Sequence, residues 1–228
     1  MILPQLLITF LRHREVLSLV ENGMNIAVFA SGRGSNFQAI LNAIDAGTLP
    51  AHIAVLISNK SDAGAMEIAR SRGIPAHHIS QKRFPTEDAL ADAMLDVLTG
   101  QRADLIVLAG YLKRIPARVV QQYRNRILNI HPALLPSFGG EGMYGHRVHE
   151  AVIASGVKVT GATVHLVDEE YDRGPIVEQR TVGVDRNDTP DTIAQKVLKI
   201  EHELFPCVLK AFAEGNVRIE ERKAWILP

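Results

Sequence analysis

The sequence predicts an α/β fold in which a mostly parallel, mixed central sheet is flanked by helices. Two observations predict it. From residue 24 onward, short apolar runs rich in β-branched residues alternate with helix-like stretches, the pattern of parallel strands that are covered on both faces. The chain has 228 residues and is 46% hydrophobic, which suits one substantial core. We therefore expect a single domain over residues 24–228.

Residues 1–23 are predicted to be an N-terminal extension of unknown role. The apolar run from Ile2 to Leu11 is too short to span a bilayer. It also lacks the basic leading region and small-residue cleavage site of a secretory signal. Because Met24 stands directly before the first convincing strand, the domain is expected to begin there.

The expected strands fall into two groups. Four short apolar runs suit the parallel part of the sheet, at residues 25–30, 53–58, 104–109 and 126–130. Two later runs alternate more like antiparallel or edge strands, at residues 159–167 and 176–184. Together they predict a mixed sheet.

Helices are expected between these strands and near the end of the chain. The first three cover residues 36–46, 62–72 and 86–98, and each is followed by a glycine that suits a helix end: Gly47, Gly73 and Gly100. A later helix has Thr189 as its cap and Pro190 at its first position, followed by apolar residues at helical spacing. Pro206 is expected to end or kink that helix.

Charge and cysteine content exclude several kinds of partner. Lysine plus arginine and aspartate plus glutamate each number 25, so no net charge attracts nucleic acid or an anionic membrane. Cys207 stands alone, which fits a reducing, cytoplasmic location, and we expect it to be a small buried apolar group. No metal is expected, because His77 and His78 are adjacent, and His146 with His149 lacks a third ligand.

A glycine-rich segment follows the first strand, with the sequence Ser31-Gly32-Arg33-Gly34-Ser35-Asn36. Glycines let the backbone approach a ligand closely, and the start of the following helix favours a phosphate. The motif alone is weak evidence, because Phe37 replaces the third glycine of a dinucleotide fingerprint. A merely tight strand-to-helix turn is the alternative.

The fourth strand ends in Asn129-Ile130-His131-Pro132-Ala133-Leu134-Leu135-Pro136. Alternation along a strand puts Asn129 and His131 on the same face, where an amide donor and an imidazole suit a developing oxyanion. Ligand sites of open α/β sheets gather at this end of the strands. A purely structural histidine before a proline remains the alternative.

An acidic turn follows the strand expected near residue 165. It contains four acids, Asp168, Glu169, Glu170 and Asp172, and spacing alone does not choose among them. A carboxylate near His131 would favour imidazolium and organise proton transfer, whereas a solvated turn would have the same composition.

Together these motifs resemble the phosphoribosylglycinamide formyltransferases, a branch of the folate-dependent formyltransferase family. The resemblance rests on Ser-Gly-x-Gly-Ser-Asn, on Asn-Ile-His-Pro-Ala-Leu-Leu-Pro, and on Thr-Val-His followed by Tyr-Asp-x-Gly-Pro, in this order across residues 24–228. It implies a Rossmann-like, three-layer formyltransferase fold. It also implies that Asn129, His131 and Asp172 are the catalytic residues.

The resemblance implies binding residues as well. Those expected to bind the substrate phosphate are Gly34, Ser35 and Asn36, and Glu201 is expected near the ribose or amine. The folate-binding set is Lys113, Arg114, Ile115 and Asn129; Lys113 stands where many family members have arginine. The loop over residues 138–146 is richer in glycine than in well-known members, which suggests a flap over the site, with His146 either taking part in closure or being structural.

The activity implied is transfer of the formyl group of 10-formyltetrahydrofolate to the amine of glycinamide ribonucleotide in purine biosynthesis. The partners implied are these two small molecules, with the chain as a monomer or a homodimer and without nucleic acid, membrane or metal. Another folate-dependent formyltransferase or a formyltetrahydrofolate hydrolase is the alternative. A methionyl-tRNA formyltransferase should carry an additional C-terminal RNA-binding domain, and a formyltetrahydrofolate hydrolase usually has an N-terminal regulatory domain.

Overall fold

A computed structural model describes residues 23–228, so the predicted extension lies outside the described residues apart from Gly23. A seven-stranded sheet forms the centre, in the order β3-β2-β1-β4-β5-β6-β7. The strands are β1 Met24–Phe29, β2 Ala51–Ser58, β3 Ala76–His78, β4 Leu105–Leu108, β5 Ile127–His131, β6 Val159–Leu166 and β7 Ile176–Gly183. A separate hairpin consists of β8 Val217–Glu220 and β9 Lys223–Ile226.

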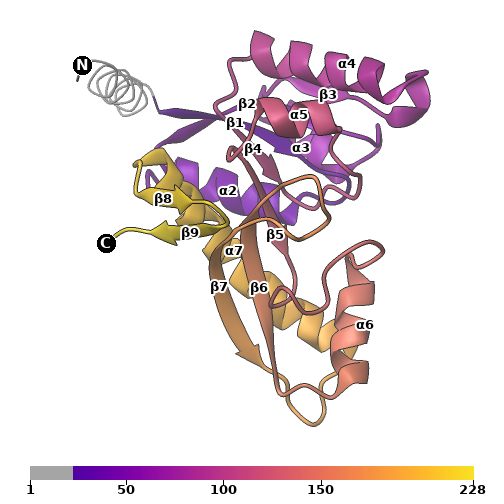
Figure 1. Ribbon diagram of the computed structural model, residues 1–228, viewed down its shortest axis with the longest axis vertical. Helices are drawn as coiled ribbons and strands as arrows, with labels where there is room; N and C mark the ends of the chain where they lie inside the picture. The colour runs from indigo at the N-terminus through magenta and orange to yellow at the C-terminus, as the bar shows by residue number, and fades with distance from the viewer. Residues whose placement is uncertain (1–22) are drawn as a thin grey trace.

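The sheet is mixed, as the sequence predicts. β1 to β5 pair in parallel, whereas β6 runs antiparallel to β5 and β7 antiparallel to β6. The helices are α2 Ser35–Asp45, α3 Gly64–Ser71, η1 Gln81–Arg83, α4 Glu87–Gly100, α5 Ala117–Gln122, α6 His146–Ser155 and α7 Pro190–Ala213. The predicted α/β class with helices on both faces is therefore confirmed (Figure 1).

Alternate residues of the central strands enter two different cores. In β1, Ile26 and Val28 pack with α2, α3 and α7, while Ala27 and Phe29 pack with α4 and α5. All four side chains are fully buried. This two-sided burial explains why the parallel strands are continuous apolar runs rather than alternating ones.

The ends predicted for α2, α3 and α4 lie within two residues of the ends in the structure. Gly47 and Gly73 follow α2 and α3 with positive φ angles of 68° and 66°, as expected of helix terminators. Gly100 instead lies inside the last turn of α4, and the left-handed residue is Arg102, with φ 51°. The short elements β3, α5, α6, β8 and β9 were not predicted, because each is too brief or too polar for a clear periodic pattern.

One of the two effects expected of Pro206 in α7 does not occur, and the expectation for Cys207 is wrong. The helix does not end at Pro206 but continues to Ala213. Phe205, Val208 and Leu209 are fully buried around the proline, and this packing outweighs the single backbone hydrogen bond that proline cannot make. Cys207 is exposed rather than buried, because it lies on the face of the helix opposite these apolar residues.

The start of α7 has the predicted cap. Thr189 Oγ1 accepts a hydrogen bond from the Thr192 amide at 3.3 Å, and Thr192 Oγ1 accepts one from the Thr189 amide at 2.9 Å. This reciprocal pair satisfies two backbone donors that the first turn leaves free.

Replacing Thr189 with alanine should lower the free energy of unfolding by about 1 kcal/mol, because the Thr192 amide loses its acceptor. Urea unfolding monitored by circular dichroism measures the change. Thr189→Ser retains the hydroxyl and is the matched control, expected to stay close to the wild type. Equal destabilisation by both variants would show that the hydroxyl contributes nothing.

Candidate active site

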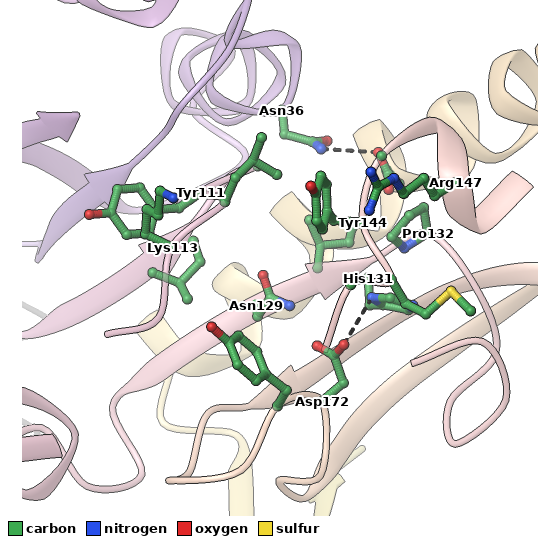
Figure 2. Close-up of a pocket in the computed structure, with 18 of the residues that line it drawn as sticks. Asn36, Tyr111, Lys113, Asn129, His131, Pro132, Tyr144, Arg147 and Asp172 are labelled. Carbon is green, nitrogen blue, oxygen red and sulfur yellow. Dashed lines mark hydrogen bonds and ion pairs between the residues drawn. The ribbon is translucent and has the colours of Figure 1, made fainter. Parts of the chain in front are cut away.

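A cavity of about 1100 Å³ opens at the carboxyl ends of β1, β4 and β5. Its walls come from the segments that follow these strands, from the first half of α6 and from the cavity-facing side of α7. The sheet order reverses direction between β1 and β4, where ligand sites of open α/β sheets form. Figure 2 shows Asn129, His131 and Asp172 near the centre of this cavity, with Asn36 and Lys113 toward its sides.

The glycine-rich segment turns from β1 directly into α2. Gly34 caps the helix with φ 84°, and a Cβ atom there would lie 3.0 Å from the Ala65 backbone, so glycine is required for both reasons. Ser35 is exposed and begins the helix, while Asn36 is buried and lines the cavity. The helix start therefore offers free backbone N–H groups beside the cavity, as a phosphate site needs.

Asn36 and Glu201 meet across 165 positions of sequence. Asn36 Nδ2 donates to Glu201 Oε2 at 3.0 Å, and within the described chain Asn36 Oδ1 has no partner. Glu201 is 7% exposed, and burial raises the pKa of its carboxyl to about 7, against the opposing effect of Asn36. The structure thus brings together two of the residues that the resemblance assigns to nucleotide binding.

Asn129 and His131 point from the same face of β5, as alternation predicts, and Asp172 approaches from the loop between β6 and β7. His131 Nδ1 lies 3.6 Å from Asp172 Oδ2. Burial lowers the pKa of His131 below its usual 6.5, although Asp172 and the Phe138 carbonyl oppose this. Burial and the neighbouring carboxylate thus act in opposite directions on the protonation of His131.

Asp172 is ionised despite being largely buried. Burial alone raises the pKa of its carboxyl, but His165, His131 and the Gly140 amide together lower it below 3.8. The Gly140 amide donates to Asp172 Oδ2 at 2.9 Å. A permanent carboxylate beside a titratable imidazole is an arrangement suited to proton transfer.

His165 is a fourth member of this cluster, to which the sequence assigned no role. Antiparallel pairing sets it directly opposite Asn129 on β6. Its Nδ1 donates to the Leu166 carbonyl oxygen at 2.9 Å, while its Nε2 lies 3.0 Å from Asn129 Nδ2 and 3.5 Å from Asp172 Oδ1. The signal was present in Thr-Val-His, but only the strand pairing shows which residue the histidine orients.

The glycine-rich loop over residues 138–146 touches the cluster at two points. His131 Nε2 donates to the Phe138 carbonyl at 2.8 Å, and Gly140 holds Asp172 as described. Phe138, Gly140, Gly142 and Gly145 all have positive φ angles. His131 must release the Phe138 carbonyl before its Nε2–H can serve a ligand.

The histidines of α6 differ in setting. His146 lines the cavity and is half exposed, 3.6 Å from Glu150 and 3.8 Å from Asp191. His149 is buried beside the cavity, and burial lowers its pKa to about 4, so it is neutral at pH 7.

The predicted folate side forms the other wall of the cavity. Ile115 is 4% exposed, whereas Lys113 and Arg114 are exposed at the rim. Arg114 Nη2 donates to the Glu169 carbonyl at 2.6 Å and so joins this segment to the acidic loop.

Ser31 fixes the position of the same wall. Its hydroxyl donates to Asn59 Oδ1 and accepts from the Leu112 amide at 2.9 Å. A single buried side chain therefore connects the glycine-rich segment with the predicted folate segment, a link that local sequence did not indicate.

Two further observations concern metal ligands and membrane-spanning helices. Among residues 23–228, no three His, Cys, Asp or Glu side chains are grouped so that they could hold a metal ion. Within the same range, every helix is too short or too polar to cross a membrane.

Comparisons with known proteins agree with this geometry. A family model described as formyl transferase matches residues 24–209. A protein named phosphoribosylglycinamide formyltransferase, chloroplastic, from Arabidopsis thaliana is 46% identical over 86% of the chain and 68% of its own length. One named phosphoribosylglycinamide formyltransferase from Bacillus subtilis is 39% identical over 86% of the chain and 97% of its own length.

Solved structures give the same result. The crystal structure of glycinamide ribonucleotide transformylase 1 from Symbiobacterium toebii superposes with a TM-score of 0.85 at 38% identity, covering 90% of this chain and 94% of that one. On these grounds the chain belongs to the formyl transferase family.

Proposed function

We propose that this protein transfers the formyl group of 10-formyltetrahydrofolate to the amine of glycinamide ribonucleotide, giving formylglycinamide ribonucleotide and tetrahydrofolate in purine biosynthesis. The observation that carries the proposal is the convergence of Asn129, His131 and Asp172 between a phosphate-suited helix start and a second, partly apolar wall. The names of the relatives supply the acceptor, and the family resemblance implies 10-formyltetrahydrofolate as the donor.

The nucleotide fits the side of the cavity near α2. Free amides at Gly34, Ser35 and Asn36 suit a phosphate monoester, which the helix start stabilises further. The Asn36 and Glu201 pair lies deeper in the cavity, where a ribose hydroxyl can donate to the carboxyl and accept from the amide. With the phosphate at the start of α2 and the ribose beside Asn36 and Glu201, the amine of the nucleotide would point toward Asn129.

The folate fits the opposite wall, where Leu108, Ile115 and Val167 supply apolar surface for a flat ring. Backbone groups of residues 110–115 and the rim cations Lys113 and Arg114 surround this surface. Apolar walls with a few fixed polar groups are typical of cofactor and cosubstrate sites. The bound cosubstrate supplies the reactive formyl group.

Asn129 is suited to stabilise the negative charge that the formyl oxygen gains as the amine attacks. One hydrogen of its Nδ2 is held by His165, which leaves the other free to face the cavity. Because His165 is 2% exposed and fixed by the Leu166 carbonyl, the amide is oriented before substrate arrives.

His131 and Asp172 move the proton. The growing negative charge and the Asp172 carboxylate both favour imidazolium, so His131 can hold the proton that the attacking nitrogen releases while the tetrahedral intermediate exists. The attacking nitrogen gains a bond to the formyl carbon and loses one proton. Asp172, directly or through a water, passes that proton to the folate nitrogen as its bond to the formyl carbon breaks.

Replacing Asn129 or His131 with alanine should lower kcat by about 100-fold or more, because each removes a donor to the developing oxyanion. The assay follows folate absorbance with 10-formyltetrahydrofolate and three acceptors: glycinamide ribonucleotide, water alone and initiator methionyl-tRNA. His52→Ala, an exposed histidine on β2, is the matched control and should retain full activity. Turnover in water alone would replace the proposal with a hydrolase, and near-normal activity of His131→Ala would remove the assigned role.

Asp172→Asn should also abolish most formyl transfer while leaving the site assembled. The amide keeps the size of the carboxyl, and its oxygen still accepts from Gly140, but it cannot take a proton or favour imidazolium. Comparison of kcat with the KM for each substrate measures the change, which should fall mainly on kcat. A loss confined to KM would assign Asp172 to binding instead.

Glu201→Gln should change how stability depends on pH. A carboxyl whose pKa rises from 4.5 to about 7 on folding gives stability at low pH that is lost as pH rises between these values. Glutamine does not titrate, so relative to the variant the wild type should lose up to about 3 kcal/mol over this window. Urea unfolding from pH 4.5 to 8 measures both curves, and parallel curves would contradict the raised pKa.

A further inference from the structure

The loop that presents Asp172 has little backbone support of its own. Residues 168–174 join β6 to β7 without forming a helix or a strand, and Tyr171 and Asp172 lie in a turn within this segment. Asp172 itself has φ 55°, a left-handed conformation that costs free energy in a residue with a side chain. Contacts from outside the loop, such as the Gly140 amide that donates to Asp172, help to stabilise this conformation.

Arg222 supplies such a hold from the turn between β8 and β9. Its Nη2 donates to the carbonyl of Arg173, the residue directly after Asp172. Its Nη1 lies 3.2 Å from Asp168 Oδ2 at the start of the loop. One planar guanidinium thus holds the loop on both sides of Asp172.

Asp168 extends this hold into the loop. Asp168 Oδ2 accepts a hydrogen bond from Arg222, and Asp168 Oδ1 accepts one from the Glu170 amide at 3.0 Å. Arg114, from the opposite wall of the cavity, holds the Glu169 carbonyl. Side chains from two distant segments, Arg114 and Arg222, therefore hold this loop.

The hairpin that carries Arg222 is anchored to the body of the protein. Ala224 on β9 is 8% exposed, and Ile219 and Ile226 pack against the main core. Figure 1 shows the hairpin beside the sheet, at the end of the chain. The backbone that carries Arg222 is therefore held in place by the hairpin, although the Arg222 side chain itself is 68% exposed.

We propose that Arg222 is a positioning residue, which keeps the Asp172 carboxylate aimed at His131 by fixing the loop from behind. Asp172 Oδ2 lies 3.6 Å from His131 Nδ1, so a small shift of the loop would break the pair. A misplacement of about 1 Å at a reacting group costs up to about 100-fold in rate. The inference rests on the proposed function, because it assigns Arg222 to the reaction of that site.

Arg222→Met should lower kcat about 3- to 10-fold, with the KM for both substrates within about twofold of the wild type. Arg218→Met is the matched control, since Arg218 lies on the same hairpin and its side chain pairs, among residues 23–228, only with Glu220. Arg222→Lys can donate to one acceptor at a time and should restore part of the lost kcat. Because Arg222 is exposed, the melting temperature should stay close to that of Arg218→Met.

A second measurement does not depend on activity. NMR titration of His131 should give a lower pKa in Arg222→Met than in the wild type, because a displaced Asp172 raises it less. The proposal would be overturned if the pKa of His131 stayed unchanged and the kcat of Arg222→Met equalled that of Arg218→Met. It would also be overturned if the fall in kcat came with a fall in melting temperature, because general destabilisation would then explain the lost activity. A wild type without formyl transfer would refute the proposed function alone, since the His131 titration still reports whether Arg222 holds the loop.

Discussion

The antiparallel pairing of β5 with β6 is the constraint on which the candidate site depends. This register sets Asn129 opposite His165 and His131 opposite Thr163. Thr163 is fully buried, and its hydroxyl donates to the Ala133 carbonyl and accepts from the Leu135 amide, which fixes the segment that follows His131. A slip of one residue would turn every one of these side chains to the other face of the sheet.

Two buried carboxyls in one cavity titrate in different pH ranges, and their surroundings explain why. Asp172 is near two imidazoles and a backbone amide, which stabilise its ionised form against burial. Glu201 has only the neutral Asn36 amide beside it, so burial prevails and its pKa rises to about 7. Pairs of acids whose environments separate their pKa values are typical of sites that divide proton transfer from binding.

Most of the fold could be predicted from local sequence. The strands that are buried on both faces, such as β1, are continuous apolar runs, and this pattern predicts them as strands. Thr189 and Pro190 mark the start of α7. The errors came where packing competes with local preference. Pro206 would end an isolated helix, but buried neighbours on both sides keep α7 continuous.

The sequence by itself determined that Asn129 and His131 share a face, because strand alternation is a local property. Only the tertiary structure decided what surrounds them. Glu201 reaches Asn36 across 165 residues, and Arg222 reaches Arg173 across 49. Such contacts depend on how α7 packs on α2 and where the C-terminal hairpin docks, and these are long-range outcomes of burying the whole apolar surface that no local pattern encodes.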